Sequence, residues 1–472
     1  MRISLVFLGL SWLALPCLSK NQELNTERYI DGLDHDDLRT VLDLKPDPWR
    51  SVEEGHLARL LIPRACESDH STDVRNYMKD IFVKLGWHTE ETAFTSKTPI
   101  GDVTFTNLIA TFDPEAPTKL VLSAHFDSKH YDTWPANQFI GATDSAAPCS
   151  TLLDVAESLT PLLRHKQTLV QADEYEGDEE WAHTTLQIVL FDGEEAFHDW
   201  TATDSIYGAR HLAERWESTY LPDNHAYHSS YLATRRYDPT PSILSTIENL
   251  VLLDLLGAVD PHISSYSKRT HWLFKHLADV EDRLEELRRE GLPNKGKGKG
   301  KWFEGFGWAG AIDDDHRPFL ERGVSILHLI ANPFPRVWHT LGDDASVLDM
   351  PTLRKWNALM RIFTVEYLGL PVPSSSPGEV EQSAGMGMAA RTDDLVSLSR
   401  KEGIMQRMKR KVRVRAELVF VLFRTRICSG YVVMGLVCTA SVVIDRDNSI
   451  SSHQYLLDSK LSGDCLIHRP RS

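Results

Sequence analysis

The chain has 472 residues, of which 51 are lysine or arginine and 67 are aspartate or glutamate. The resulting net charge of −16 argues against a nucleic-acid-binding protein and favours a soluble protein. The length is compatible with two or three average domains, or with one α/β enzyme that carries tails.

The N-terminus has the layout of a secretory signal peptide. Arg2 is followed by an apolar core from Ile3 to Leu15 and then by a short segment that ends at Ser19. This core is too short to span a membrane as a helix. We therefore expect residues 1–19 to be removed, and the protein to be secreted or to remain in the lumen of the secretory pathway.

The main part of the chain, residues 20–372, is predicted to be one α/β domain. From about residue 50 to 370, short apolar runs alternate with amphipathic segments, which is typical of a parallel sheet covered by helices. We predict a central twisted, mostly parallel mixed sheet that is flanked by helices on both faces. The predicted strands are residues 105–112, 119–126, 185–191, 250–257 and 325–330, and the predicted helices are residues 73–86, 144–163, 205–216, 271–290 and 350–369.

The tail, residues 373–472, lacks this pattern. It begins as a linker rich in serine and glycine, becomes basic at 409–415 and has 18 uncharged residues at 427–444. Eighteen residues are at the lower limit for a membrane span, and the basic cluster lies on the side opposite to the positive-inside expectation. A membrane anchor, an additional segment without a partner, and a wrongly predicted C-terminal exon all stay open.

Two adjacent glutamates, Glu194 and Glu195, follow directly after the buried strand predicted at 185–191. Neighbouring residues on a continuing strand point to opposite faces, so one carboxylate would enter the core unless the backbone turned first. Gly193 permits such a turn. Both carboxylates could then face one cleft, as a metal site with a neighbouring acid/base requires.

Other polar residues also lie where the predicted strands end: His125, Asp144, Asp254 and His339. The carboxyl ends of strands form the ligand crevice of open α/β sheets, and imidazole with carboxylate suits zinc. Alone, each residue has a simpler explanation. Asp144 could cap a helix, His125 could be a core histidine with satisfied hydrogen bonds, and Asp254 could bond to nearby backbone. The whole set supports a site better than any single member does.

Several motifs resemble those of one family, the secreted glutaminyl-peptide cyclotransferases of the animal and fungal type. "AHFDSK", "GATDSAAPCS", "LFDGEEAF", "DSIYGARHLA", "LLDLLGA", "DDDHRPFL", "GVSILHLI" and "FPRVWHT" occur in order, and the similarity covers roughly residues 25–370. The resemblance implies the α/β fold of zinc aminopeptidases and one zinc ion per chain. It also implies that the substrates are peptides and proteins with N-terminal glutamine, which is converted to pyroglutamate with release of ammonia.

The resemblance also assigns roles to individual residues. Asp144, Glu195 and His339 would be the ligands of the zinc ion, and Glu194 would be the general acid/base. Asp254 and Asp314 would be its hydrogen-bonded acidic partners, and they would raise its pKa if they share a proton with it. His328, Trp200 and Trp338 would line the substrate pocket, although aromatic residues as a class are more often core residues and His328 could simply be packed within a strand.

The chemistry suits these residue types. The α-amine of the glutamine attacks its own side-chain amide carbonyl, and ammonia leaves. Zinc bound to the carbonyl oxygen would polarise the carbonyl, while Glu194 would take the proton of the amine and return it to the departing nitrogen.

The cysteines depart from the vertebrate pattern. Cys17 would leave with the signal peptide, so an odd number, five of the six, remains and assigns no disulfide framework. Vertebrate cyclases carry a cysteine where this chain has Ala124, bonded to the position of Cys149. We therefore expect that cross-link to be absent, and buried free thiols are the simplest interpretation of Cys66 and Cys149.

Two alternatives compete with a cyclase. A secreted zinc aminopeptidase of the same fold would use His125, Asp144, Glu195, Asp254 and His339 to bind two metal ions, so the ligand types alone do not exclude it. Trp200, Trp338 and the segment "DDDHRPFL" favour the cyclase. A non-catalytic ectodomain held by the tail is the second alternative, and the complete set of catalytic residue types argues against it.

Overall fold

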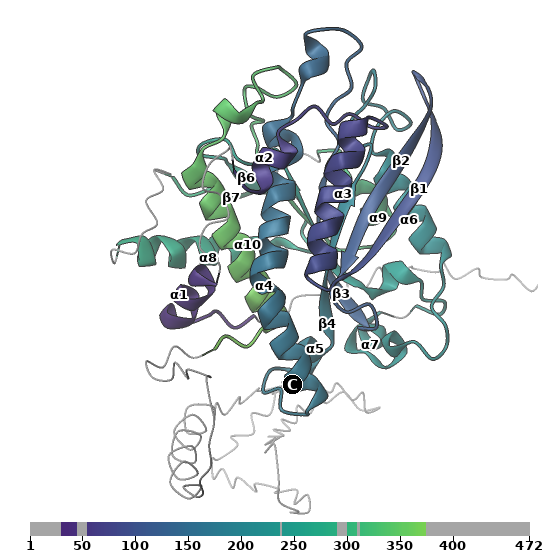
Figure 1. Ribbon diagram of the computed structural model, residues 1–472. Coiled ribbons are helices and arrows are strands. Elements are labelled where there is room, and N and C mark those ends of the chain that lie inside the picture. The colour runs from purple at the N-terminus through teal and green to yellow at the C-terminus, as the bar shows by residue number, and fades with distance from the viewer. Residues whose placement is uncertain (1–29, 45–53, 237, 290–299, 309–311, 374–472) are drawn as a thin grey trace, which may run out of the picture. The chain divides into compact units, whose positions relative to one another are not determined.

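The central sheet has six strands in the order β1-β2-β4-β3-β5-β8 (Figure 1). The computed structural model describes residues 30–44, 54–236, 238–289, 300–308 and 312–373. β1 and β2 form an antiparallel hairpin, β2 pairs antiparallel with β4, and all later pairs are parallel. The strands are β1 (His88–Thr98), β2 (Gly101–Thr111), β3 (Thr118–His125), β4 (Thr184–Phe191), β5 (Ile247–Asp254) and β8 (Ile326–Ile330). The predicted mixed sheet is therefore confirmed.

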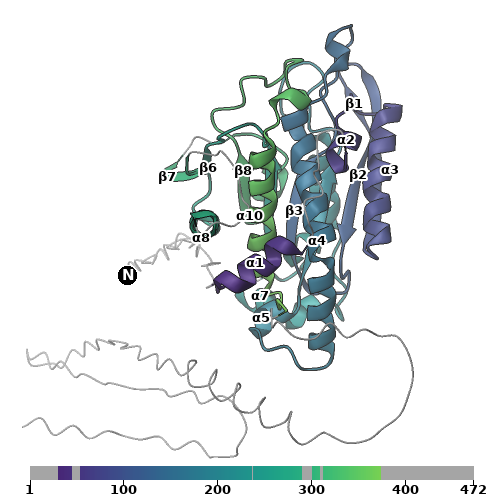
Figure 2. The same ribbon diagram turned by 60° about the vertical axis from the view of Figure 1, so that its left-hand side comes forward.

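Helices cover both faces of the sheet because alternate residues of the buried strands point to opposite sides. Leu120 and Leu122 of β3 join the larger core cluster, whereas Val121 joins the smaller one on the other face. The larger cluster holds α1 (His35–Asp43), α3 (Asp69–Lys84), α4 (Ala147–Gln171), α8 (His271–Arg289) and α10 (Met350–Leu368), of which α4 and α10 lie side by side (Figure 2). The smaller cluster holds α6 (Tyr207–Ser218) and α9 (Arg317–Glu321).

Short elements connect these layers. A separate two-stranded parallel sheet is formed by β6 (Ile263–Ser265) and β7 (Phe303–Trp308). A π-helical turn, Ala142–Ala146, precedes α4, and the remaining short helices are α2 (His56–Leu60), α5 (Glu179–Ala182) and α7 (Tyr231–Arg235), with 3-10 turns at Ala136–Gln138, Ala226–Ser229, Ile243–Thr246 and Ala345–Val347.

Several of the predicted elements need correction. β1, the short strands β6 and β7, and helix α1 were not expected from the sequence. The predicted helix 144–163 begins later, at Ala147, and ends later, at Gln171, because Asp144 has non-helical backbone angles. The N-cap position of α4 is occupied by Ala146, so Asp144 does not cap this helix. The predicted strand 250–257 ends at Asp254, where Leu255 adopts a positive φ of 53°.

Several predictions lie outside the described residues. These are the signal peptide at 1–19 and the basic and apolar tail segments at 409–415 and 427–444. Within the part of the chain that the structure describes, no helix combines the length and apolar character that a membrane crossing requires.

Cys66 and Cys149 are free thiols, so the absence of the vertebrate cross-link is confirmed. Cys149 is fully buried, and its thiol donates a hydrogen bond to the carbonyl oxygen of His125 at 3.0 Å. Cys66 is only partly buried, which corrects the expectation for that residue.

Candidate metal centre and acid/base site

The candidate site is formed at the carboxyl ends of the parallel strands. His125 ends β3, Asp254 ends β5, and the two glutamates follow β4. Because β3 pairs with both β4 and β5, these three strand ends are neighbours in the sheet. The topology therefore brings together residues that are far apart in the sequence, as expected for an open α/β sheet.

The turn after β4 separates the two glutamates from the strand. Gly193 has a positive φ of 79°, and a Cβ atom there would lie 2.4 Å from Cδ1 of Phe105. The buried carboxylate of Asp127 accepts hydrogen bonds from the backbone N–H groups of Glu194 and Glu195, both at 3.2 Å. The expected turn at Gly193 is confirmed, and Asp127 fixes the backbone of both glutamates beyond it.

Asp144, Glu195 and His339 form one compact cluster whose potential ligand atoms lie within 4.8 Å of one another. Nε2 of His339 lies 3.5 Å from Oδ2 of Asp144 and 3.3 Å from Oε2 of Glu195. His339 has a positive φ of 55°, and the hydroxyl of Tyr131 donates a hydrogen bond to its carbonyl oxygen at 3.2 Å. The ring of Trp338 stacks on that of His339 with 3.9 Å between centroids.

The electrostatics of this cluster suit a bound cation. Burial lowers the pKa of His339, but the carboxylates of Asp144 and Glu195 outweigh it and raise the pKa to about 9. Oδ2 of Asp144 and Oε1 of Glu195 are buried and accept no hydrogen bond among the described residues. Two carboxylates and one imidazole are a donor set that zinc accepts in catalytic sites, so the residues present fit such an ion.

Glu194 is buried beside this cluster. Burial raises its pKa well above the ordinary value, and the charges of Glu195, Asp314 and Asp315 raise it further against the opposing effect of His125. A buried carboxyl group with a raised pKa is suited to acid/base catalysis.

Asp254 and Asp314 do not hydrogen-bond to Glu194 in the part of the chain described. Asp254 accepts a hydrogen bond from the hydroxyl of Ser145 at 3.0 Å, and Asp314 contacts His328. Burial raises the pKa of each of these two carboxyl groups to about 6, and the charge of Asp314 contributes to the rise for Asp254. The expected hydrogen bonds to Glu194 are therefore not formed, and Asp314 acts on Glu194 through its charge, which raises the pKa of Glu194.

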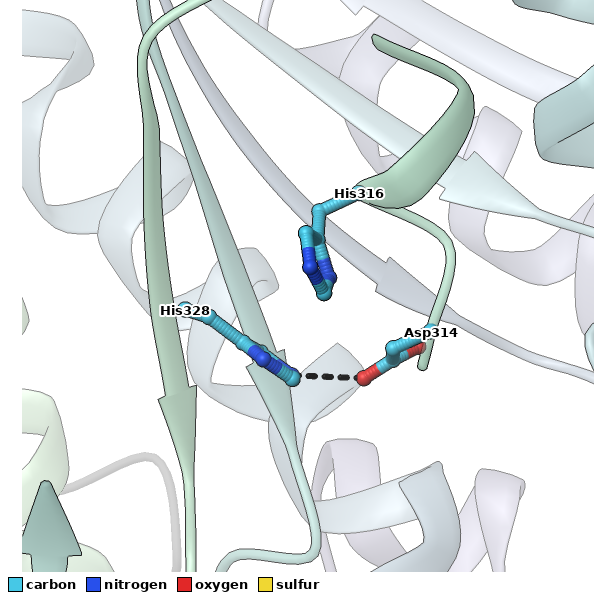
Figure 3. Close-up of side chains that lie close together, drawn as sticks. All are labelled: Asp314, His316 and His328. Atoms are coloured by element: carbon cyan, nitrogen blue, oxygen red, sulfur yellow. Dashed lines mark hydrogen bonds and ion pairs between the residues drawn. The ribbon is translucent and has the colours of Figure 1, made fainter. Parts of the chain in front are cut away.

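His328 lies next to Asp314 and His316 (Figure 3). Nε2 of His328 lies 2.7 Å from Oδ2 of Asp314, and the rings of His316 and His328 are 4.4 Å apart between centroids. Burial lowers the pKa of His316 to about 3 and that of His328 to about 4, so both imidazoles are neutral at physiological pH. His328 is packed within β8, as the simpler alternative expects, and its ring also contacts the carboxyl group of Asp314.

Trp200 and Trp338 are not core residues. Their side chains are 39% and 40% exposed, and Nε1 of Trp200 donates a hydrogen bond to Oδ2 of Asp313 at 3.3 Å. Trp338 adjoins the metal cluster through His339. An exposed aromatic ring beside a cluster of ionisable groups is suited to contact a ligand.

A second cluster lies beside the first and shares Asp144 with it. Nε2 of His125 lies 3.0 Å from Oδ1 of Asp144 and 3.4 Å from Oδ1 of Asp254. Burial lowers the pKa of His125, but the surrounding carboxylates, Glu194 foremost, raise it well above the ordinary value. The five positions that a two-metal peptidase would use therefore converge in this chain.

Sequence reasoning did not assign a role to Asp127, Lys129, Tyr131 or His316. The ammonium group of Lys129 lies 3.4 Å from Oε2 of Glu195 and donates a hydrogen bond to the carbonyl oxygen of Ala196 at 2.8 Å. Three of these residues lie next to a candidate site residue within a quoted motif: Asp127 and Lys129 in "AHFDSK", and His316 in "DDDHRPFL".

An α/β sheet with clustered carboxylates and histidines at its strand ends defines a class of metal-site enzymes. Comparison with known proteins then identifies the family within this class. The model of peptidase family M28 matches residues 107–364. The glutaminyl-peptide cyclotransferase-like protein of Mus musculus is 38% identical over 356 residues, which cover 75% of this chain and 84% of that protein. The glutaminyl-peptide cyclotransferase of Bos taurus is 37% identical over 323 residues, which cover 67% of this chain and 82% of that protein.

A solved structure gives the same result. The crystal structure of Macrostomum lignano glutaminyl cyclase is 34% identical, covers 74% of this chain and 98% of that chain, and superimposes with a TM-score of 0.60. The chain therefore belongs to peptidase family M28 and, within it, to the glutaminyl-peptide cyclotransferases.

Proposed function

We propose that this protein is a zinc-dependent glutaminyl-peptide cyclotransferase that converts the N-terminal glutamine of peptides and proteins to pyroglutamate and releases ammonia. One observation carries the proposal. Of two adjacent buried glutamates, Glu195 belongs to a cluster with Asp144 and His339, whereas Glu194 lies outside that cluster. In this proposal Glu195 binds the metal ion and Glu194 transfers the proton.

Asp144, Glu195 and His339 would hold one zinc ion per chain. When bound, zinc supplies Lewis acidity that polarises the side-chain amide of the substrate. The stacked ring of Trp338 and the hydrogen bond from Tyr131 orient His339, so the ligand is held before the ion arrives.

Glu194 would move the proton. The α-amine of the substrate forms a bond to the side-chain carbonyl carbon, and the carboxylate of Glu194 accepts the proton that the amine loses. Glu194 then returns this proton to the side-chain nitrogen as the carbon–nitrogen bond breaks, and ammonia leaves. Asp314 would support this role because its charge raises the pKa of Glu194. Asp254 lies close to the proposed ligand Asp144, and both carboxylates contact Nε2 of His125.

Trp200, Trp338 and His328 would contact the N-terminal residue of the substrate. The two tryptophans are about two-fifths exposed, so they are accessible from solvent, whereas His328 is buried. We expect little recognition beyond the first residue and its neighbour. The protein would act in the secretory pathway or outside the cell, would not bind nucleic acid, and would associate with a membrane only if residues 427–444 are a true anchor.

The decisive experiment compares two peptides. Residues 20–372 are incubated with a peptide that begins with glutamine, scored for ammonia, and with a peptide that begins with leucine, scored for free leucine. We expect ammonia release that a chelator abolishes and zinc restores, and no free leucine. Leucine release without cyclisation would contradict the proposal, and Trp200 and Trp338 would then not have the roles in glutamine binding proposed above.

The aminopeptidase is kept as a second candidate because His125, Asp144 and Asp254 retain the geometry of a second metal position. The metal content of the active protein separates the two. One tightly bound zinc ion per chain supports the cyclase, and two tightly bound ions support the peptidase.

A further inference from the structure

The side chains of Asp314, His316 and His328 form a group of potential metal ligands that has no part in binding the catalytic zinc. Their potential ligand atoms lie within 4.8 Å of one another, and all three side chains are buried. Asp314 lies in the loop before α9, His316 is the residue at the start of α9, and His328 is in β8. Figure 3 shows the two rings and the carboxyl group facing a common space.

The chemistry of this group is that of a transition-metal site. It offers two imidazole nitrogens and one carboxylate oxygen, the donor types that zinc and cobalt accept in three-residue sites with an open position. Nδ1 of His316 and Nδ1 of His328 are buried without a hydrogen-bond partner among the described residues. The side chain of His316 is 8% exposed.

This group shares no residue with the cluster of Asp144, Glu195 and His339. An ion bound to it therefore adds to the catalytic zinc and does not replace it. Affinity is limited because Asp314 is already engaged: Oδ1 accepts a hydrogen bond from the backbone N–H of Asp315 at 2.6 Å, and Oδ2 contacts His328 at 2.7 Å. A metal ion must break the second of these contacts, so we expect binding that is weaker than at the catalytic site.

We propose that Asp314, His316 and His328 form a second, inhibitory metal site. The inhibition rests on the proposed function, in which Asp314 supports Glu194 and His328 contacts the substrate. An ion held by both side chains withdraws them from these tasks. Zinc above one equivalent per chain should thus lower activity without displacing the first ion.

The test titrates the protein that holds one equivalent of zinc with further zinc, and it measures bound zinc by equilibrium dialysis alongside ammonia release. We expect a second equivalent to bind, with loss of activity at the same midpoint. In the His316→Asn variant, the zinc concentration at half-maximal binding of the second equivalent and that at half-maximal loss of activity should both rise at least tenfold. The first equivalent of zinc should stay bound. His316→Gln serves as a second variant if the asparagine variant does not fold.

His125→Asn is the matched control, because it disrupts the neighbouring cluster of His125, Asp144 and Asp254 and leaves Asp314, His316 and His328 in place. If the second equivalent is lost in His125→Asn and retained in His316→Asn, the inhibitory site is wrong and the ion binds at the peptidase position. Absence of any second equivalent up to about millimolar zinc also overturns it. Because bound zinc is measured directly, failure of the proposed cyclase activity would leave the binding result readable.

Discussion

Glu194 and Glu195 are adjacent in the chain, yet their surroundings differ. Glu195 contacts two positive groups, the ammonium of Lys129 at 3.4 Å and the ring of His339 at 3.3 Å. Burial raises the pKa of both carboxyl groups, but the acidic neighbours of Glu194 include Asp314 and Asp315, whereas that of Glu195 is Asp144. One backbone turn after β4 therefore gives two identical side chains different charged neighbours.

Replacing Glu194 by glutamine should abolish most turnover and spare the metal. The amide keeps the shape of the side chain but cannot accept the proton, and loss of a general base costs on the order of 10²–10⁴-fold in kcat. Ammonia release and zinc content are the measurements, with Glu195→Gln as the control that should lose zinc. A kcat within about threefold of the parent protein would show that another group moves the proton.

Replacing Tyr131 by phenylalanine should weaken zinc binding without changing kcat at saturating zinc. The hydroxyl donates to the carbonyl of His339, a residue at a φ of 55° that depends on its surroundings to keep this conformation. One hydrogen bond contributes about 0.5–1.5 kcal/mol, so the zinc Kd should rise about two- to tenfold.

Competition with a chromophoric chelator measures that Kd. Tyr227→Phe is the matched control, because the buried hydroxyl of Tyr227 has no hydrogen-bond partner among the described residues. Equal zinc affinity in Tyr131→Phe and the parent protein would mean that the ring of Trp338 and the chain itself fix His339.

At the scale of single residues, the sequence predicts which residues share a site more reliably than it predicts which of them contact one another. The resemblance to the cyclotransferases groups Asp144, Glu195 and His339 in one site, and in the structure these three residues form one cluster. The predicted partner of Asp314, Glu194, was wrong. Asp314 contacts His328 instead, because His328 in β8 lies against the loop before α9. Such pairings depend on side-chain directions that no local pattern encodes.

At the scale of elements, α4 and α10 are joined by a buried ion pair. The guanidinium of Arg361 donates to both carboxylate oxygens of Asp154, at 2.7 and 2.6 Å, and both side chains are almost fully buried. A bidentate pair satisfies both charges. Removal of one partner leaves the other charge buried without compensation, which is costly.

Arg361→Leu should therefore lower the free energy of unfolding by about 3–5 kcal/mol. The double variant Asp154→Leu/Arg361→Leu should recover much of this loss, since no charge then remains buried. Urea unfolding followed by circular dichroism measures both. A double variant that is no more stable than the single one would show that packing at this contact, and not the charge, holds α4 against α10.

Lys119 at the start of β3 should make stability rise with pH in the alkaline range. Burial lowers its pKa from 10.5 to about 8, although Asp113 and Glu115 oppose this shift. The folded state therefore releases the proton before the unfolded state does. The cost of burying the ammonium is fully present below about pH 8 and is lost as the pH rises towards 10.5.

Lys119→Met should raise the free energy of unfolding at pH 7 by about 3 kcal/mol, the value that corresponds to this lowering of the pKa. The gain should shrink when the same urea titration is repeated at pH 10. Lys97→Met on the exposed hairpin is the control and should change little at either pH. A gain in Lys119→Met that is the same at both pH values would contradict the titration argument.

Element prediction succeeded where burial is complete and failed where it is partial. All residues of β3, β4 and β5 are buried, and each of these strands appears in the sequence as an apolar run. β1 reads "HTEETAFTSKT" and is mostly exposed or half-buried, so it has no apolar run to detect. It is stabilised by pairing along its length with β2, which is a tertiary effect.

At the scale of the whole molecule, zinc should stabilise the fold. The proposed ligands Asp144, Glu195 and His339 converge only in the folded chain, so an ion bound there favours the native state by mass action. Zinc at about 100 times its Kd contributes about 2.7 kcal/mol, which corresponds to a rise of a few degrees in Tm.

Differential scanning calorimetry with and without chelator measures this shift. Glu195→Gln should show a much smaller zinc-dependent rise. An equal rise in that variant would mean that the stabilising ion binds elsewhere, with the group of Asp314, His316 and His328 as the first place to examine.

The order of the proposed ligands along the chain has a consequence for biosynthesis. Asp144 and Glu195 come early, on either side of β4, but His339 follows β8, the last strand of the sheet. A growing polypeptide that has left the ribosome only as far as β5 therefore carries two carboxylates and no third ligand. Metal capture must await the C-terminal part of the domain, so a truncated translation product that ends before residue 339 should emerge without the ion and without activity.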